Sequence, residues 1–317
     1  MDSEELKKVA QRARFMREAG FALLLASLLL ALIIFLPILG VAKKMPLAPA
    51  ATATSTASGS FADVPIEAKA AIVYDLATGK TLYAKNADAQ LPLASLTKLL
   101  TMYAAFKELS PTTPIAIPED ATHLSAPHAF KAGQTFRLED LARITLTASL
   151  NDGATAIAEA TAAHEERSLS TMLASVATGL GLAQTYAVNG SGLDVNTAVS
   201  GGYGSAHDLA RLAGALVAEA PSVTLATTRN TAQAVSLEGT AFNVKNTDPI
   251  VDNVPNLLLS KTGYTDLAGG NLALVFDAGI GHPIAVVVLG STEKARFTDG
   301  AALVDATLAH FAGVTSL

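Results

Sequence analysis

The sequence of 317 residues contains no cysteine, and charged residues make up only 16% of it, against 50% hydrophobic residues. The absence of cysteine excludes a disulfide framework, a thiol nucleophile and any Cys-ligated metal site. An exported domain of this size does not need disulfide bonds, so cysteine content does not decide the compartment. The length and hydrophobic content are sufficient for one large domain with appendages.

Basic charge is also scarce over most of the chain. Residues 45–317 carry 15 of the 22 Lys and Arg but 24 of the 28 Asp and Glu, a net charge of −9. This balance argues against a nucleic-acid partner. The polar segment 111–133 contains His123 and His128, whose five-residue spacing is weak evidence for a metal site. We interpret this segment as a surface loop and expect no metal and no cofactor.

Residues 19–42 form an uncharged hydrophobic run of 24 residues. A helix of this length, at about 1.5 Å per residue, exceeds the roughly 30 Å hydrocarbon layer of a membrane. Signal peptides usually have a shorter apolar core, so we expect an uncleaved anchor, with cleavage among the small residues 48–53 as the alternative. Five Lys and Arg residues precede the run and only two follow it, which predicts a cytoplasmic amino terminus.

This pattern predicts a single-pass protein of the cytoplasmic (inner) membrane with an extracytoplasmic domain. Residues 1–18 are the expected cytoplasmic tail and residues 19–42 the transmembrane anchor. Residues 43–60 are rich in Pro, Ala, Ser and Thr and are expected to form a flexible linker. The remaining residues, 61–317, are expected to form one domain.

The hydrophobic periodicity of residues 61–317 predicts strands at both ends and helices between them. This order predicts an α+β fold, with one sheet formed by both ends of the domain and a helical insertion at about residues 116–223. The predicted strands are residues 70–74, 80–84, 226–230, 240–244, 257–262, 272–276 and 284–289. The predicted helices begin at residue 95 and span residues 138–149, 152–164, 168–180, 207–219 and 298–311.

Ser95 and Lys98 lie at the start of the predicted helix that follows Pro92. Their spacing places both side chains on one face of the helix, one turn apart. A serine hydroxyl needs a neighbouring base to become a nucleophile, and partial burial favours the neutral form of a lysine. Because Ser-x-x-Lys is expected roughly once by chance in a chain of this length, the pair alone does not identify an enzyme.

Two further motifs follow in the chain. Ser149-Leu150-Asn151 lies at the break between two predicted helices, and Lys261-Thr262-Gly263 lies at the end of a predicted strand. Ser-x-Asn is also expected about once by chance, whereas Lys-Thr-Gly is expected only about 0.1 times. Their order and structural context make the combination of three motifs specific.

With these motifs the sequence resembles the serine-type D-alanyl-D-alanine carboxypeptidases, low-molecular-mass penicillin-binding proteins of the β-lactamase superfamily. The resemblance includes residues 70–98, 138–159, 189–208 and 260–272 and covers most of residues 61–317. It implies an antiparallel sheet flanked by helices, an all-helical subdomain and an active site between the two. Many relatives also carry a β-rich second domain and a carboxy-terminal amphipathic anchor. Because residue 317 follows soon after the last predicted helix, we expect neither feature here and expect the amino-terminal span to serve as the anchor.

The resemblance also implies catalytic roles. Ser95 is the expected nucleophile and Lys98 its base, with Ser149 and Asn151 on the opposite wall of the site, where capping a helix end is their alternative role. Ser95 is expected to attack the penultimate D-alanine carbonyl of a peptidoglycan stem peptide and to release D-alanine, after which water hydrolyses the ester. β-Lactams are expected to acylate Ser95 as substrate mimics. Which group is the acylation base is disputed in this superfamily, so Lys98 is assigned on geometry.

The same resemblance implies substrate-binding residues. Lys261, Thr262 and Gly263 are expected to orient the substrate from their strand, and the backbone N–H group of Tyr264 joins that of Ser95 as an oxyanion hole. Arg296, which lies 35 residues after Lys261, is expected to bind the carboxylate of the terminal D-alanine. Its alternative role is a solvated surface charge.

Three departures from the family pattern are expected to shift substrate preference or rate. Leu150 stands where many relatives have a small residue, Ser260 where glycine is frequent, and Tyr264 where some carboxypeptidases have histidine.

Three alternative functions stay open. An endopeptidase that cuts D-alanyl cross-links would use the same residues. A class A β-lactamase would need a Glu-x-x-Leu-Asn signature, which this sequence does not contain. A non-catalytic wall-binding membrane protein would need no base beside a serine.

Overall fold

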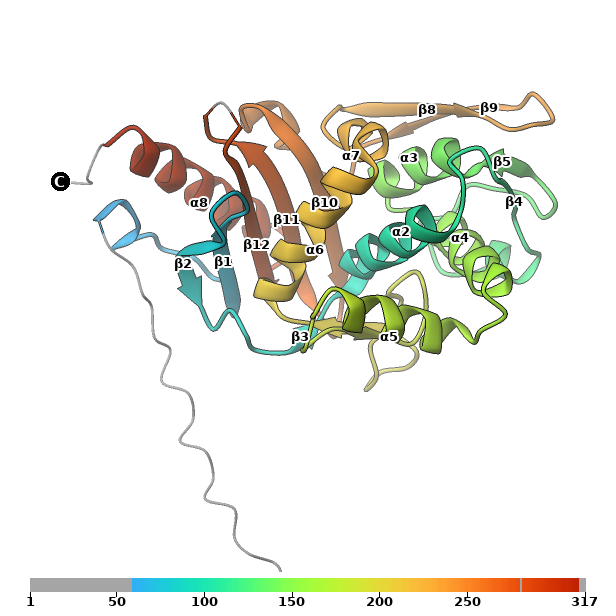
Figure 1. Cartoon of the computed structure of the whole chain (residues 1–317), viewed down its shortest axis with the longest axis horizontal. Coiled ribbons are helices and arrows are strands. Elements are labelled where there is room, and N and C mark those ends of the chain that lie inside the picture. Colours follow the sequence, from blue (N-terminus) through green and yellow to red (C-terminus); the bar gives the residue numbers. More distant parts are fainter. Residues whose placement is uncertain (1–58, 280, 314–317) are drawn as a thin grey trace, which may run out of the picture. The chain divides into compact units, whose positions relative to one another are not determined.

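Strands from the two ends of the described chain pair in one antiparallel sheet. The computed structural model describes residues 59–279 and 281–313. The strand order is β10-β11-β12-β1-β2, so the last strand of the chain lies beside the first (Figure 1). This confirms the α+β fold predicted from the periodicity. The strands are β1 (Ala70–Asp75), β2 (Lys80–Lys85), β10 (Leu257–Thr265), β11 (Gly269–Asp277) and β12 (Pro283–Ser291).

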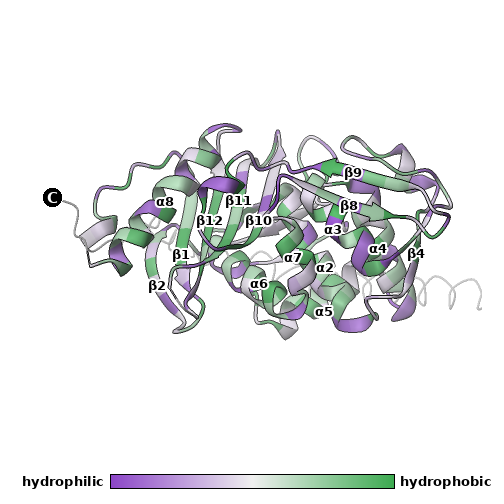
Figure 2. Ribbon diagram, turned by 90° about the horizontal axis from the view of Figure 1, so that it is seen from above, coloured by the Kyte–Doolittle hydropathy of each residue, from purple (hydrophilic) through white to green (hydrophobic). Residues whose placement is uncertain are grey.

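Helices cover both faces of this sheet. Successive side chains of a strand point to opposite faces, so Val286 and Val288 pack in the layer under α8 (Ala295–Phe311). Val287 packs in the opposite layer, which contains α6 (Ala206–Glu219). Burial on both faces explains the uninterrupted hydrophobic sequence of β12, and the central strands are accordingly among the most apolar parts of the ribbon in Figure 2.

Most of the chain between β2 and β10 forms a second, largely helical part beside the sheet (Figure 1). A 3₁₀ turn, η2 (Ala94–Leu96), leads directly into α2 (Thr97–Glu108), which packs against α4, α5 and α6. The predicted insertion, at about residues 116–223, begins after α2 and includes α6 (Ala206–Glu219). In the structure α2 belongs to the helical part, whereas α6 packs on the sheet. The remaining elements are β3 (Leu91–Pro92), β4 (Pro114–Ala116), η3 (Asp120–His123), β5 (Thr135–Arg137), α3 (Leu138–Ala148), α4 (Asn151–His164), α5 (Leu169–Gly179), β6 (Tyr186–Ala187), β7 (Gly202–Gly204), α7 (Pro221–Ala226), β8 (Thr231–Val235), β9 (Ala241–Lys245) and η4 (Val251–Asn253).

The strand predicted at residues 226–230 is wrong. The helix α7 ends at Ala226, turns follow, and the next strand begins only at Thr231. Pro221 at the first helical position favours a helix start, and Val223 is fully buried where α7 packs against α3 and β10. Tertiary packing therefore overrides the strand preference of the β-branched residues in this segment.

The first described element is η1 (Gly59–Phe61), so the last two residues of the predicted linker already belong to a structured turn. Phe61 is buried and its ring lies beside those of Tyr83 and His310. The predicted anchor, residues 19–42, lies outside the described residues. Within residues 59–279 and 281–313, no helix is long and apolar enough to cross a membrane.

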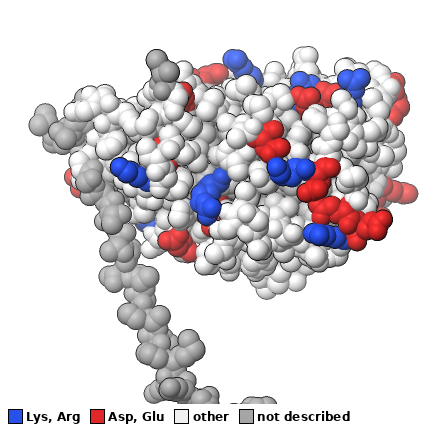
Figure 3. Space-filling view, viewed as in Figure 1, with Lys and Arg blue, Asp and Glu red and all other residues white. Residues whose placement is uncertain are grey.

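Charged side chains are sparse on the face of the described domain that Figure 3 shows. Acidic and basic residues are interspersed there, and acidic side chains gather toward the end that carries α4 and α5 in Figure 1. Neutral side chains make up most of this face, as expected when only 16% of the residues are charged.

Candidate active site

Ser95 lies in the η2 turn, where the chain passes from β3 into α2. The turn is held by Asn271 of β11, whose Nδ2 donates to the Pro92 carbonyl oxygen at 3.0 Å. Ala94, directly before Ser95, has a φ of 48°, which is uncommon for a residue other than glycine. Such outliers are tolerated where the surrounding structure determines the conformation. Ser95 remains partly exposed, whereas both of its neighbours in the turn are buried.

Lys98 is fully buried one turn after Ser95 and makes three short contacts. Its Nζ lies 2.8 Å from Ser95 Oγ, 2.7 Å from Asn151 Oδ1 and 2.8 Å from the Ser191 carbonyl oxygen. The amide and carbonyl oxygens only accept hydrogen bonds, so two N–H groups satisfy them and the lone pair of a neutral amine is left for the hydroxyl of Ser95. Burial, and then the charge of Lys261, hold the pKa of Lys98 well below 10.5, against the opposing charge of Asp152.

The Ser149-Leu150-Asn151 segment forms the turn between α3 and α4. Ser149 ends α3 in the left-handed conformation, with a φ of 59°, and Asn151 begins α4. Asn151 Nδ2 donates to the Ser125 carbonyl oxygen at 2.9 Å, which directs Oδ1 toward Lys98. The turn therefore brings both polar side chains to the same side of the site, one to each lysine.

Lys261 lies within β10. This strand extends to Thr265, three residues beyond the predicted end at residue 262. Its buried Nζ donates to Ser149 Oγ at 2.8 Å and to the Thr262 carbonyl oxygen at 2.7 Å. Burial lowers the pKa of Lys261 to about 7, with a further contribution from the charge of Arg296 and opposition from that of Asp248. Lys261 therefore titrates near neutral pH.

Gly263 is the point at which β10 meets the turn that carries Ser95. A Cβ atom on Gly263 would lie 3.0 Å from the Leu93 carbonyl oxygen and 3.3 Å from the backbone nitrogen atoms of Ser95 and Leu96. Glycine allows this close approach of two backbones. The predicted oxyanion donors, the N–H groups of Ser95 and Tyr264, therefore come from two segments in direct contact.

Arg296 lies in the first turn of α8, beside the end of β10. Its Nη1 donates to the Gly263 carbonyl oxygen at 3.0 Å, and its guanidinium carbon lies 5.9 Å from the Tyr264 ring centroid and 4.6 Å from that of Phe297. Only 8% of the side chain is exposed, and its buried Nε has no hydrogen-bond partner among the described residues. The alternative role of a solvated surface charge is thus wrong. Burial lowers the pKa of this guanidinium.

Some groups at the site were not predicted from the sequence. The Ser191 carbonyl oxygen comes from a loop 93 residues after Lys98, and Thr247 Oγ1 lies 2.6 Å from Thr262 Oγ1. Ser191 lies within residues 189–208, which resemble the family, but the resemblance assigned no role to its carbonyl oxygen. Nothing in the local pattern indicates the contact of Thr247.

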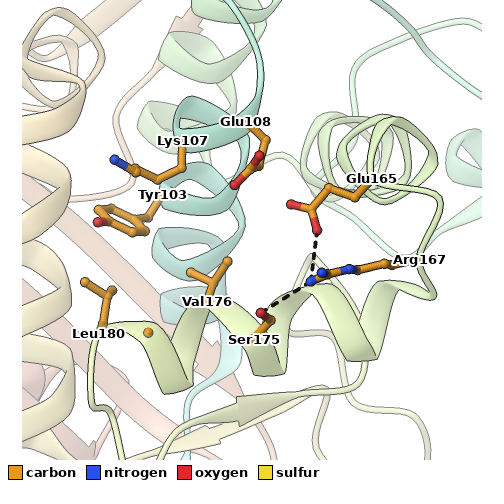
Figure 4. Close-up of a pocket in the computed structure, with 9 residues that line it drawn as sticks. Tyr103, Lys107, Glu108, Glu165, Arg167, Ser175, Val176 and Leu180 are labelled. Carbon is orange, nitrogen blue, oxygen red and sulfur yellow. Dashed lines mark hydrogen bonds and ion pairs between the residues drawn. The ribbon is translucent and has the colours of Figure 1, made fainter.

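A pocket of about 570 Å³ lies elsewhere, between the second half of α2 and α5 (Figure 4). Lys107 and Tyr103 line it from α2, and Arg167 bridges Glu165 and Ser175 along its opposite side. None of the three motifs contributes to it. Because Ser95 precedes α2 and Lys107 lies near its end, this pocket is distinct from the lysine and serine cluster. Within the described ranges, no three His, Cys, Asp or Glu residues are grouped to hold a metal ion.

Comparisons with known proteins identify the family. A family model described as D-alanyl-D-alanine carboxypeptidase matches residues 53–293. The D-alanyl-D-alanine endopeptidase of Pseudomonas aeruginosa is 30% identical over 80% of this chain and 82% of its own length. The D-alanyl-D-alanine carboxypeptidase DacF of Bacillus subtilis is 32% identical over 73% of this chain, but the match spans only 59% of DacF.

The fold is also found in solved structures. Penicillin-binding protein D2 from Listeria monocytogenes, solved in an ampicillin-bound form, matches with a TM-score of 0.66 and 27% identity. The match covers 77% of this chain and 99% of that structure. The D-alanyl-D-alanine carboxypeptidase of Mycobacterium tuberculosis matches with a TM-score of 0.68 at 24% identity, which supports the fold. The resemblance inferred from the three motifs is thus confirmed: the chain belongs to the D-alanyl-D-alanine carboxypeptidase family of serine peptidases.

Proposed function

We propose that this protein is a serine D-alanyl-D-alanine carboxypeptidase that removes the terminal D-alanine from peptidoglycan stem peptides through an acyl-enzyme on Ser95. The observation that carries the proposal is the fully buried Lys98, whose Nζ lies 2.8 Å from Ser95 Oγ and whose other two partners are acceptor oxygens. This arrangement favours a neutral amine that is ready to accept the serine proton.

In the proposed acylation, Lys98 takes the hydroxyl proton as Ser95 Oγ attacks the penultimate D-alanine carbonyl carbon. The backbone N–H groups of Ser95 and Tyr264 stabilise the oxyanion. When the tetrahedral intermediate collapses, the C–N bond breaks and the departing D-alanine amine takes a proton from Ser149 Oγ, which Lys261 contacts at 2.8 Å. The proton that Lys98 took from Ser95 then passes to Ser149, so Lys98 is again neutral and Ser149 is again a hydroxyl. Water attacks the ester carbonyl while Lys98 accepts a proton from it, and this proton goes to Ser95 Oγ as the acyl C–O bond breaks. No redox step and no cofactor is needed.

Arg296 favours the carboxypeptidase reaction among the activities of this family. Its guanidinium lies at the end of β10, and its Nε is buried without a partner among the described residues. A buried, unsatisfied donor is costly, and a substrate carboxylate near it would relieve that cost. A pentapeptide stem carries such a terminal carboxylate beside its scissile bond.

A D-alanyl-D-alanine endopeptidase is the second candidate. It is favoured by the endopeptidases of Pseudomonas aeruginosa and Escherichia coli, whose lengths are matched to 82% and 83%, whereas the match to DacF covers 59%. The same serine and lysines would cleave the D-alanyl bond of a cross-link. Incubation with a pentapeptide and, separately, with a cross-linked dimer distinguishes the two, since the carboxypeptidase releases free D-alanine only from the first.

Mass spectrometry tests the acyl-enzyme. After incubation with a penicillin, we expect a covalent adduct on the peptide that contains Ser95, because the solved neighbour from Listeria monocytogenes holds ampicillin. Ser95→Ala should abolish the adduct and the release of D-alanine while leaving thermal unfolding nearly unchanged, since this side chain is partly exposed. Ser110→Ala, at an exposed position, is the control. Full turnover by the Ser95 variant would refute the nucleophile.

We also propose that residues 19–42 anchor the protein in the cytoplasmic membrane and that the domain lies outside it. Support comes from the sequence alone, through the length of the uncharged run and the excess of Lys and Arg before it. In a bacterial host, the full chain should sediment with membranes and be digested by external protease in spheroplasts. Recovery of the full chain in the soluble fraction would contradict the anchor.

A further inference from the structure

Asp248 is a buried carboxylate behind the strand that carries Lys261. It lies between β9 and η4 and is 1% exposed. Its Oδ2 accepts a hydrogen bond from Ser260 Oγ at 2.5 Å, and its Oδ1 accepts one from the Ile250 N–H at 2.9 Å. Both partners donate, which is the environment that an ionised carboxylate requires.

Thr247, the residue before Asp248, makes a similar contact with β10. Thr247 Oγ1 lies 2.6 Å from Thr262 Oγ1, and the Thr247 N–H donates to the Thr147 carbonyl oxygen at 3.2 Å. Two adjacent loop residues therefore hold Ser260 and Thr262, which flank Lys261 on β10. The loop constrains the strand on both sides of this lysine.

Charged groups of several elements meet at this point. Arg296 from α8 and Asp248 from the loop act on Lys261 with opposite signs, and Lys98 from α2 is in turn affected by Lys261. On α3, which also packs against β10, Arg143 and Asp140 pair with each other at 2.6 Å. Asp248 is thus the carboxylate whose charge acts on both Lys261 and Arg296.

We propose that Asp248, through Ser260, is a positioning residue that keeps Lys261 in place and protonated for catalysis. The proposal rests on the proposed peptidase function of this site. Lys261 can hold Ser149 as a proton donor and attract a substrate carboxylate only in its charged form, and it is buried near the cation Arg296. A fixed negative charge on the far side of β10 offsets that repulsion.

The pKa of Asp248 is raised, because the effect of burial exceeds the opposite effects of the hydrogen bonds from Ser260 and Ile250 and of the charges of Arg296 and Lys261. These contacts fit the ionised form of Asp248, because the Ser260 hydroxyl and the Ile250 N–H group both donate to its carboxylate oxygens. Loss of the Ser260 hydroxyl should therefore weaken the charge of Asp248 and act on Lys261 in the same direction as loss of Asp248 itself.

The test is the pH dependence of Ser95 acylation by a fluorescent penicillin in the full chain. Lys261 loses its proton as the pH rises through about 7, so acylation should decline on the alkaline side. In Asp248→Asn, which keeps the shape of the side chain, this decline should move about one pH unit toward acid. Ser260→Ala should move it in the same direction by less.

Asp208→Asn is the matched control. Asp208 is also a buried carboxylate that accepts one hydroxyl, from Thr185 at 2.9 Å, and one backbone N–H, from Gln184 at 2.8 Å. It lies on α6 and is not among the groups whose charge acts on Lys261. Its variant should lose stability like Asp248→Asn while keeping the pH profile of the wild type.

A measurement without any activity separates this inference from the proposed function. NMR of protein labelled with ¹³C at the lysine ε carbons follows the titration of Lys261, assigned by the signal that Lys261→Arg removes. The titration should shift toward acid in Asp248→Asn even if the enzyme released no D-alanine. Coincident titrations in wild type and Asp248→Asn, an equal shift in Asp208→Asn, or failure of both Asp248→Asn and Ser260→Ala to fold would overturn the proposal.

Discussion

The two buried lysines of the site differ in what surrounds their amino groups. Lys98 lies between a hydroxyl and two acceptor oxygens, whereas Lys261 lies near the carboxylate of Asp248 as well as near Arg296. Burial lowers the pKa of both, and each positive charge disfavours the other. The surroundings therefore favour a neutral Lys98, whereas Lys261, with a pKa of about 7, is charged in only part of the molecules at neutral pH. The proposed mechanism uses the neutral form of Lys98 and the charged form of Lys261.

This difference predicts the effect of Lys98→Arg. An arginine keeps the positive charge and cannot release its proton, so it cannot act as a base. We expect acylation by penicillin to fall by about 10² or more, measured as the second-order rate constant. Lys107→Arg, at a surface position of the same helix, should leave the rate unchanged.

In the wild type, acylation should fall as acid protonates Lys98, at a pH well below the 10.5 of a free lysine. It should also fall as base deprotonates Lys261 above about pH 7. The profile is thus a bell whose two limbs belong to the coupled pair. A rate that kept rising to pH values near 10.5 would contradict the neutral state of Lys98.

Arg296 predicts a second change at the scale of a single side chain. Because it is proposed to bind the terminal carboxylate, Arg296→Ala should slow hydrolysis of a D-alanyl-D-alanine peptide by about tenfold or more. The same peptide with an amidated carboxyl end should be affected little, since it carries no charge to bind. The measurement is kcat/KM for the free and for the amidated peptide, each in wild type and in Arg296→Ala. Equal losses for the two peptides would refute the role of Arg296.

At the scale of elements, the η2 turn is fixed between two backbones. On one side lies β10 at Gly263, and on the other lies Gly192, where a Cβ atom would stand 1.9 Å from the Ala94 carbonyl oxygen. The same loop supplies the Ser191 carbonyl oxygen to Lys98. Glycine is therefore needed at both contacts so that three separate segments can converge on Ser95.

Gly263→Ala tests this packing. The added Cβ would come within 3.0 to 3.3 Å of the backbone around Ser95, so the turn and the strand must separate by a few tenths of an ångström. We expect kcat for peptide hydrolysis to fall by about tenfold to a hundredfold, because oxyanion donors act only at close range. Gly179→Ala, at the end of α5 with no atom within 4 Å of its Cβ, should leave kcat unchanged.

At the scale of the domain, Asp299 joins the segment before β1 to the end of the chain. Its oxygens accept the N–H groups of Glu67 at 3.0 Å and Ala68 at 2.9 Å, and the hydroxyl of Ser291 at 2.7 Å. This buried carboxylate connects α8, β12 and the beginning of the sheet. Closure of the sheet by its two ends thus depends on a polar contact as well as on hydrophobic packing.

Asp299→Ala should therefore reduce the free energy of unfolding by about 3 kcal/mol, because it leaves buried donors without an acceptor. Chemical denaturation measures the loss, and Asp63→Ala, at an exposed position, should change stability by less than about 0.5 kcal/mol. Acylation of Ser95 should persist in the folded variant, since Asp299 contacts none of the motif residues. A loss of acylation without a loss of stability would contradict this structural role.

The sequence by itself determined the family, the three motifs and most of the elements, because these depend on local order. Serine and lysine one helical turn apart, a polar pair at a helix break and an alternating strand pattern are properties of neighbouring residues. The strands β1 and β2 and the final helix were predicted for the same reason. The predicted strand at residues 226–230 failed because its conformation is imposed by packing against α3 and β10.

Only the tertiary structure decided which groups complete the site. The Ser191 carbonyl oxygen reaches Lys98 across 93 residues, and Asp248 reaches β10 from a loop that has no pattern of its own. The burial of Arg296 likewise depends on α8 lying beside the end of β10. The charge states of both lysines follow from these long-range contacts, because desolvation and neighbouring charge are properties of the packed interior and are not encoded at the residue itself.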